Sequence, residues 1–224
     1  MRKAILHLKK SDPVMRAIIE SVGPCRMQFR DPTFHGVARA IVYQQLNGRA
    51  AATILKRFTD LAGDPLTPEG ILKVTPEQMR SAGLSKQKSS YLIDMAERAQ
   101  RGELDFSRIH EMSDEQVIEH LTQVKGVGVW TAHMFLMFSL RRPNILPTGD
   151  FGIRMAMYRH YIEKARKNDK ARKNGAGKSG KKPCKKKIVL PKPEQMEKLA
   201  KAWEPYRSIA CWYLWRSLDV KTIG

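Results

Sequence analysis

The sequence has few cysteines, and they do not follow the spacings in which cysteines bind a metal. Its three cysteines, Cys25, Cys184 and Cys211, lie far apart and form no Cys-x-x-Cys pair. Their odd number and wide spacing argue against a disulfide framework, a structural zinc site and an iron–sulfur cluster held by four cysteines. We therefore expect no cofactor and a reducing compartment of the cell.

Two kinds of apolar pattern are also missing. There is no run of about 18 apolar residues, so the sequence predicts no membrane-spanning helix. The first residues, MRKAILHLKKSDP, place charges on both sides of a short apolar stretch, which is not typical of a signal peptide. Long alternating runs of β-branched residues are absent too, and this argues against a sheet protein.

Acidic residues are scarce relative to basic ones. The chain has 41 Lys and Arg against 22 Asp and Glu, a formal net charge of +19. Such an excess attracts polyanions by releasing their counterions, and nucleic acid is the commonest of them. An anionic membrane surface is the alternative partner, but no basic amphipathic segment stands out. We expect no membrane association.

One segment holds much of the excess charge. Residues 164–187, KARKNDKARKNGAGKSGKKPCKKK, contain 12 Lys and Arg, one Asp and no large apolar side chain. Because such a stretch cannot bury enough surface to offset its ordering entropy, we predict a basic flexible loop. Its net charge of +11 leaves +8 for the rest of the chain, which therefore stays basic without it.

The elements that the sequence does predict are short helices. Cap residues recur ahead of apolar stretches, several of them followed by Pro at the first helical position. Apolar residues are spaced closer to 3.6 than to 2 residues apart, and we predict an all-α protein. The caps are Ser11-Asp12, Thr67, Thr75, Ser85 and Ser113, and apolar positions that carry the period are Ile41, Leu46, Ile54, Leu55 and Phe58.

A glycine-rich turn joins two of the predicted helices. In HLTQVKGVGVWTAHMFLMFSL, residues 120–140, Gly126 and Gly128 separate the end of one helix from another that begins at Val129. Glycine at both positions allows positive φ and a close approach by an anion. The unpaired N–H groups that open the second helix then form a phosphate site. The alternative is a plain corner between two packed helices.

A single carboxylate, Asp150, follows the second of these helices in the turn LPTGD. Placing it near nucleic-acid phosphates costs electrostatic energy, so its presence needs a reason. Asp150 could cap the helix FGIRMAMYRHY, and capping is compatible with a catalytic role.

These segments together resemble a known family. VKGVGVWTA followed by LPTGD is similar to the helix-hairpin-helix/Gly-Pro-Asp superfamily of base-excision DNA glycosylases. IVYQQLNGRAAATI, GLSKQKSSYLIDMA and WEPYRSIACWYLWRS narrow the resemblance to the alkylation-repair branch, the 3-methyladenine DNA glycosylase II family. The resemblance covers roughly residues 5 to 160 and 191 to 218.

The resemblance implies a helix-hairpin-helix DNA glycosylase fold, with two helical subdomains flanking a cleft and the Lys-rich segment as an insertion. We expect a central subdomain of roughly residues 34–140, with the hairpin at 121–132. Residues 1–33 and 141–224 form the second subdomain. The protein is expected to be a monomer.

The implied reaction is hydrolysis of the N-glycosidic bond of alkylated purines such as 3-methyladenine and 7-methylguanine in double-stranded DNA. Such a bond breaks through a sugar with oxocarbenium character. Asp150 is the implied catalytic residue, which stabilises that cation and aligns or deprotonates the attacking water. A base alkylated on a ring nitrogen is already cationic, so it leaves without a strong general acid.

Further site residues follow from the same resemblance. The base must leave the helix, and aromatic side chains can stack on it. Trp130 and Trp215 are the implied pocket aromatics, with Met134 where some relatives carry a Tyr. Leu46 is the implied wedge that fills the gap in the DNA, with Gln45 beside it. Without the resemblance, these tryptophans and Leu46 read as core residues.

The hairpin glycines and their neighbours are the implied phosphate-binding residues. A monovalent cation at the hairpin carbonyls is a further expectation, and no catalytic metal is expected. The predicted phosphate contacts are Gly126, Gly128, Thr131, Lys125, Lys86 and Lys88, although the last two could simply be a solvated helix start.

One departure from the superfamily bears on the reaction. Bifunctional members carry a lysine two residues beyond the second hairpin glycine, where it attacks the sugar as an amine. This chain has Trp130 there, so we predict a monofunctional glycosylase, in the cytoplasm or nucleoid of a prokaryote or the nucleus of a eukaryote. Three alternatives stay open: a non-catalytic DNA-binding protein, a glycosylase/lyase, and an RNA-binding protein driven by the Lys-rich segment.

Overall fold

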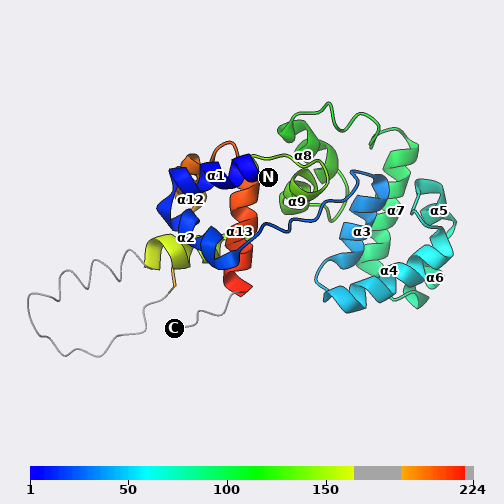
Figure 1. Cartoon of the computed structure of the whole chain (residues 1–224). Helices are drawn as coiled ribbons and strands as arrows, with labels where there is room; N and C mark the ends of the chain where they lie inside the picture. Colours follow the sequence, from blue (N-terminus) through cyan, green and yellow to red (C-terminus); the bar gives the residue numbers. More distant parts are fainter. Residues whose placement is uncertain (164–187, 220–224) are drawn as a thin grey trace, which may run out of the picture. The chain divides into compact units, whose positions relative to one another are not determined.

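The computed structural model describes residues 1–163 and 188–219, and these residues form helices and no strand (Figure 1). The all-α prediction is confirmed. The predicted basic loop, 164–187, lies outside the described residues. The helices are α1 (Arg2–Ser11), α2 (Pro13–Val22), α3 (Phe34–Tyr43), α4 (Gly48–Ala62), α5 (Pro68–Lys73), α6 (Pro76–Ser81), α7 (Lys86–Gln100), α8 (Asp114–Thr122), α9 (Val129–Phe138), α10 (Phe151–Met157), η1 (Tyr158–Glu163), α12 (Pro193–Ala200), η2 (Lys201–Trp203) and α13 (Arg207–Asp219).

The predicted start signals do cap helices. Thr75 and Ser113 each form a capping box, in which the hydroxyl accepts the N–H of Gln78 or Gln116 and the amide of that glutamine accepts in return. Such a pair satisfies two backbone donors that no helical carbonyl reaches. The remaining predicted caps, Asp12, Thr67 and Ser85, accept N–H groups from the first turns of α2, α5 and α7.

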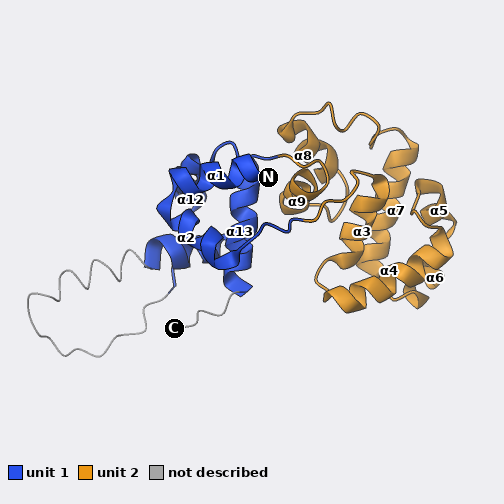
Figure 2. Cartoon of the chain, viewed as in Figure 1, with its two compact units in different colours: residues 1–27, 143–224 blue, residues 28–142 orange. Residues whose placement is uncertain are grey.

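The chain forms two compact units, which Figure 2 distinguishes by colour. Unit 2, residues 28–142, runs from α3 to α9. Helix α7 makes the most extensive contacts of this unit, packing on α3, α5 and α6, while α8 packs on α9. Phe58, Leu92 and Met95 are fully buried in its core. These contacts make α7 the platform on which the other elements of this unit are placed.

Unit 1 joins both ends of the chain, residues 1–27 and 143–224, and α13 is its central helix. This helix packs on α10, α2 and α1. The large side chains Leu8, Trp203 and Tyr213 are completely buried there. No helix among residues 1–163 and 188–219 has both the length and the apolar character needed to cross a bilayer.

A buried carboxylate, Asp12, joins three segments of unit 1. Its Oδ1 accepts the N–H groups of Val14 and Met15, at 2.8 and 3.0 Å, and so caps α2. Its Oδ2 accepts the hydroxyl of Tyr161 at 2.6 Å and the indole N–H of Trp203 at 2.8 Å. Burial, with Asp12 adding to it, raises the pKa of Tyr161. Four donors therefore compensate this carboxylate for its loss of water.

Candidate functional site

The predicted hairpin lies in unit 2, between the end of α8 and the start of α9. Gly126 has φ +78°, and a Cβ there would stand 2.1 Å from the ring of Tyr91. Gly126 is therefore required both by its backbone conformation and by the ring packed against it. The sequence allows positive φ at both glycines, but only Gly126 adopts it: Gly128 has φ −96°, and a Cβ there would meet open space. The turn needs only one left-handed residue, and Gly128 starts α9 in an extended conformation.

Side chains of α7 hold this turn in place. The carboxylate of Asp94, which is buried, accepts the backbone N–H of Lys125 at 2.9 Å and lies 3.4 Å from the Lys125 ammonium. Burial alone would raise the pKa of Asp94. The hydrogen bonds from Lys125 and Arg98 outweigh it and hold the pKa below its ordinary value. The hairpin is thus anchored by an ionised group.

The start of α9 has the geometry of an anion site. Gly128 is its N-cap and offers no side chain to the first N–H groups, and the helical bonding begins with Ala132 N–H to the Gly128 carbonyl. An uncapped helix start concentrates partial positive charge. Val129 and Trp130 are about half exposed beside it, whereas Thr131 is buried and Met134 is partly buried.

A second turn of unit 2 carries the predicted wedge. Between α3 and α4, Gln45 adopts φ +56°, an uncommon conformation for a residue with a side chain. Leu46 follows it and is 39% exposed, so it is not the core residue that its apolar character alone suggested. Gln44, which precedes both, donates its amide to the Gly126 carbonyl at 2.9 Å. No pattern in the sequence indicated this contact between residues 82 positions apart.

The three predicted phosphate-binding lysines have different surroundings. Lys86 is exposed, and Lys125 is exposed apart from its contact with Asp94. The ammonium of Lys88 instead donates to the carbonyls of Val42 and Gln44, at 2.6 and 2.8 Å, and burial lowers its pKa. Lys88 therefore holds the end of α3, and its predicted phosphate contact stays a prediction.

Asp150 lies in unit 1 as the N-cap of α10, as the capping interpretation predicts. Its Oδ1 accepts the N–H of Ile153 at 2.7 Å and the indole N–H of Trp215 at 2.8 Å, and its own N–H closes a turn on the Pro147 carbonyl. The residue is only 8% exposed. Two donors on one oxygen fix the rotation of the carboxylate, and one of them comes from a predicted site residue.

Two neighbours of Asp150 were missed by reasoning from the sequence. A Cβ on Gly152 would stand 2.9 Å from Cδ1 of Trp215 and 3.1 Å from Oδ1 of Asp150, so a side chain there would push the indole off the carboxylate. Phe151 is 67% exposed although it is large and apolar. The sequence could have indicated Phe151, because it is an aromatic residue directly after a predicted catalytic residue. It could not have indicated Gly152, whose importance appears only when α13 packs against α10.

The structure thus assembles two constellations. In unit 1 it brings Asp150 together with Trp215, and in unit 2 it brings the hairpin together with the turn that holds Gln45 and Leu46. Trp130 and Met134 belong to unit 2, on α9.

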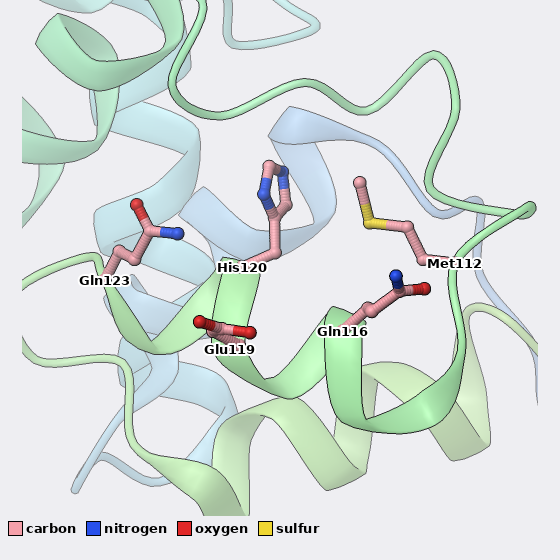
Figure 3. Close-up of a pocket in the computed structure, with 5 residues that line it drawn as sticks. All are labelled: Met112, Gln116, Glu119, His120 and Gln123. Atoms are coloured by element: carbon pink, nitrogen blue, oxygen red, sulfur yellow. The ribbon is translucent and has the colours of Figure 1, made fainter.

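A hollow of about 200 Å³ lies elsewhere in unit 2 (Figure 3). It is lined by Met112, Gln116, Glu119, His120 and Gln123, most of them from α8. The side chains stand along the helix without converging on one point, and none is a predicted site residue (Figure 3). His120 is committed to the neighbouring loop, where its Nε2 accepts the N–H of Asp105 at 3.1 Å. We assign no catalytic role to this hollow.

Comparison with known proteins places these constellations in context. Residues 38–182 match the family model described as HhH-GPD superfamily base excision DNA repair protein. The chain is 32% identical to the alkylbase DNA glycosidase-like protein mag2 of Schizosaccharomyces pombe, over 96% of this chain and 92% of the relative. The crystal structure of a DNA-3-methyladenine glycosidase from Bacillus halodurans superimposes with a TM-score of 0.73 at 32% identity, covering 95% of this chain and 87% of the other. The S. pombe 3-methyladenine DNA glycosylase Mag1 in complex with abasic DNA gives 0.74 at 30% identity, covering 97% of each chain.

Proposed function

Because the chain belongs to the HhH-GPD superfamily of base excision DNA repair proteins, we propose that it is a monofunctional DNA glycosylase for alkylated purines. The family membership confirms the resemblance carried by the hairpin and Asp150. Relatives and structural neighbours are named DNA-3-methyladenine glycosylases or glycosidases, and this supports bases of the 3-methyladenine type as substrates. Bases of the 7-methylguanine type are proposed with them. The observation that carries the proposal is the buried, doubly hydrogen-bonded carboxylate of Asp150 at the start of α10.

Asp150 acts on the sugar. As the glycosidic bond of an extruded nucleotide breaks, positive charge develops on the ring oxygen and the anomeric carbon. A carboxylate already fixed by the Ile153 N–H and the Trp215 indole stabilises that charge without reorganising first. It also orients the attacking water and accepts its proton. The alkylated purine leaves as a neutral base, so the chemistry needs no second acid.

Aromatic surface beside Asp150 suits an electron-poor base. The indole of Trp215 donates to the carboxylate of Asp150, and Phe151, the next residue after Asp150, has an exposed ring. A cationic base stacked on such rings gains about 0.5–2 kcal/mol. Trp130 and Met134 remain predicted pocket residues, and Trp130 is half exposed, as a stacking residue has to be.

The DNA backbone is held by unit 2. The N–H groups at the start of α9 bind a phosphate, with Gly126, Gly128 and Thr131 shaping the site and Lys125 adding charge. A monovalent cation on the hairpin carbonyls is part of the proposal. Leu46 and Gln45 enter the stack where the base has left it; both are exposed at the tip of their turn. The proposed partner is double-stranded DNA with alkylated bases, which the protein binds as a monomer. The proposed location is the cytoplasm or nucleoid of a prokaryote or the nucleus of a eukaryote.

The test is release of base from methylated duplex DNA. We expect the protein to liberate 3-methyladenine or 7-methylguanine, and Asp150→Asn to lower the single-turnover rate at least about a hundredfold. Asn keeps the size of the side chain and its cap to Ile153, so the loss reports charge rather than folding. Release that persists undiminished in the variant would remove Asp150 from the mechanism.

Two further measurements separate the alternatives. Treatment of the reaction with borohydride should trap no covalent adduct, whereas a glycosylase/lyase forms a trappable imine through an amine nucleophile. Full-length protein that binds duplex DNA but releases no base would identify a non-catalytic binder. Removal of residues 166–187 should weaken DNA binding and reduce its salt dependence while base release persists; complete loss of function would favour the RNA-binding alternative.

A further inference from the structure

The two DNA-facing turns of unit 2 are connected by one side chain. Gln44 lies in the turn that carries Gln45 and Leu46, and its amide Nε2 donates to the carbonyl of Gly126 at 2.9 Å. Gly126 is the residue whose left-handed conformation shapes the hairpin. A hydrogen bond therefore spans the wedge turn and the phosphate-binding turn directly.

The main chain of Gln44 is in turn held by a side chain of α7. The ammonium of Lys88 donates to the main-chain carbonyl of Gln44 at 2.8 Å and to that of Val42 at 2.6 Å. Burying an ammonium against two carbonyls costs desolvation, which is the reason the pKa of Lys88 lies below its ordinary value. The backbone at the end of α3 is thus restrained by a charge-assisted clamp.

The hairpin rests on the same helix. The ring of Tyr91 fills the space over Gly126, and the Tyr91 hydroxyl accepts the amide of Gln87 at 2.5 Å. One turn further on, Asp94 accepts the Lys125 N–H. Lys88, Tyr91 and Asp94 follow each other at spacings of three along α7, so one face of this helix supports both turns.

We propose that Gln44 is a positioning residue, which couples phosphate binding at the hairpin to insertion of the wedge turn into the gap left by the flipped base. The proposal rests on the proposed function for the roles of the two turns. A phosphate drawn to the start of α9 fixes the hairpin; through the Gly126 carbonyl, Gln44 then fixes Gln45, whose strained φ of +56° is maintained by its neighbours. The amide presents the donor that a carbonyl requires, and no other atom of that side chain can supply it.

Two variants isolate this hydrogen bond. Gln44→Glu keeps the length of the side chain but turns a carboxylate oxygen toward the Gly126 carbonyl, and Gln44→Leu removes the donor at similar volume. Gln100→Leu is the matched control, because Gln100 is an exposed glutamine at the end of α7, the helix that carries Lys88 and Tyr91. Thermal unfolding of all three proteins shows whether a variant has lost structure rather than coupling.

The readout is the stacking of DNA bases, which needs no excision. A duplex carries a tetrahydrofuran abasic analogue with 2-aminopurine beside it, and fluorescence is recorded at saturating protein so that affinity does not enter. Wild type and Gln100→Leu should raise the fluorescence by inserting the wedge, while both Gln44 variants lose most of that increase at an unchanged unfolding midpoint. Their single-turnover rates on alkylated duplex should fall about ten- to a hundredfold, as expected when a site is misplaced by about 1 Å.

The other outcomes separate a failure of the coupling from a failure of the proposed function. A full fluorescence increase in Gln44→Glu overturns the coupling, and a loss that accompanies a lowered unfolding midpoint assigns Gln44 a structural role instead. A wild type that raises the fluorescence but releases no alkylated base would contradict the proposed function while leaving the coupling supported. A wild type that saturates the duplex without a fluorescence change would overturn the coupling alone, provided that it releases base.

Discussion

Each unit of this protein builds its constellation from a glycine, an aromatic ring and a carboxylate, but uses them for different purposes. In unit 2, Gly126 makes room for Tyr91, and Asp94 holds the neighbouring backbone, where we propose that main-chain N–H groups bind a phosphate. In unit 1, Gly152 makes room for Trp215, whose indole orients the carboxylate of Asp150, the proposed catalytic group. A glycine, an aromatic ring and a carboxylate thus hold a main-chain turn in unit 2, whereas in unit 1 the glycine and the ring orient the carboxylate itself.

The largest expected difference between the units is that between chemistry and binding. Asp150→Asn should retain the affinity for DNA with an abasic analogue to within about threefold while base release falls by two or more orders of magnitude. Gly126→Ala should instead lose affinity. Fluorescence anisotropy and single-turnover kinetics on the same duplex separate the two. Equal losses of DNA affinity in Asp150→Asn and Gly126→Ala would contradict the assignment of chemistry to unit 1 and of DNA binding to unit 2.

The two hairpin glycines offer a matched pair within unit 2. Gly126→Ala places a methyl group against Tyr91 at a φ of +78° and should lower the free energy of unfolding by about 1–2 kcal/mol or more. Gly128→Ala meets open space at φ −96°; its stability should stay within about 0.5 kcal/mol while the methyl group hinders the approach of a phosphate. Urea unfolding and DNA titration check both. An equally destabilised Gly128→Ala would contradict the argument from φ.

The corresponding pair in unit 1 is Gly152→Ala and Trp215→Phe. The first displaces the indole from Asp150, and the second keeps an aromatic ring but removes the N–H that donates to Oδ1. Both should lower the single-turnover rate about tenfold, the cost of roughly one charge-assisted hydrogen bond. The apparent substrate affinity should stay near the wild-type value for Trp215→Phe. A fall in affinity without a fall in rate would mean that Trp215 acts by stacking alone.

The last expected effect, on the pH dependence of stability, concerns Asp94. Its pKa is depressed in the folded protein, so its contribution to stability is fully present above the unfolded pKa of about 4 and is lost as pH falls through the lower folded value. Asp94→Asn should therefore lower the free energy of unfolding by about 1–2 kcal/mol at pH 7. The difference from wild type should shrink below about pH 4. A difference that grew on acidification would reverse the assigned sign.

What the sequence could predict was local. The caps at Thr75, Ser113 and Asp150 follow from residues three positions apart, because a short side chain can reach only the N–H groups of its own helix start. A left-handed glycine in the hairpin follows from the same short-range reasoning. The same reasoning did not show which of the two glycines adopts the positive φ, and the structure has it at Gly126 alone of the pair.

What the sequence could not predict depends on contacts between distant segments. The amide of Gln44 finds a carbonyl 82 residues away, and the indole of Trp215 finds a carboxylate 65 residues away. Neither residue type identifies its partner until α7 and α13 have brought the segments together. Lys88 shows the converse: a lysine at a helix start is typical of a solvated surface, yet this one is committed to two carbonyls.

The hydrogen bonds to Asp12 also bear on changes in the length of the Lys-rich stretch, residues 164–187. Tyr161 precedes the Lys-rich stretch in the sequence and Trp203 follows it, and both donate to the carboxylate of Asp12. Arg154 donates to the carbonyl of Pro191. The described residues Tyr161 and Pro191, which flank that stretch in the sequence, are thereby held to the body of unit 1. Lengthening or shortening what lies between two fastened ends changes closure entropy only logarithmically. We therefore expect that adding or deleting lysines between residues 164 and 187 changes the attraction to nucleic acid, while Asp150, the proposed catalytic carboxylate, keeps its contacts in unit 1.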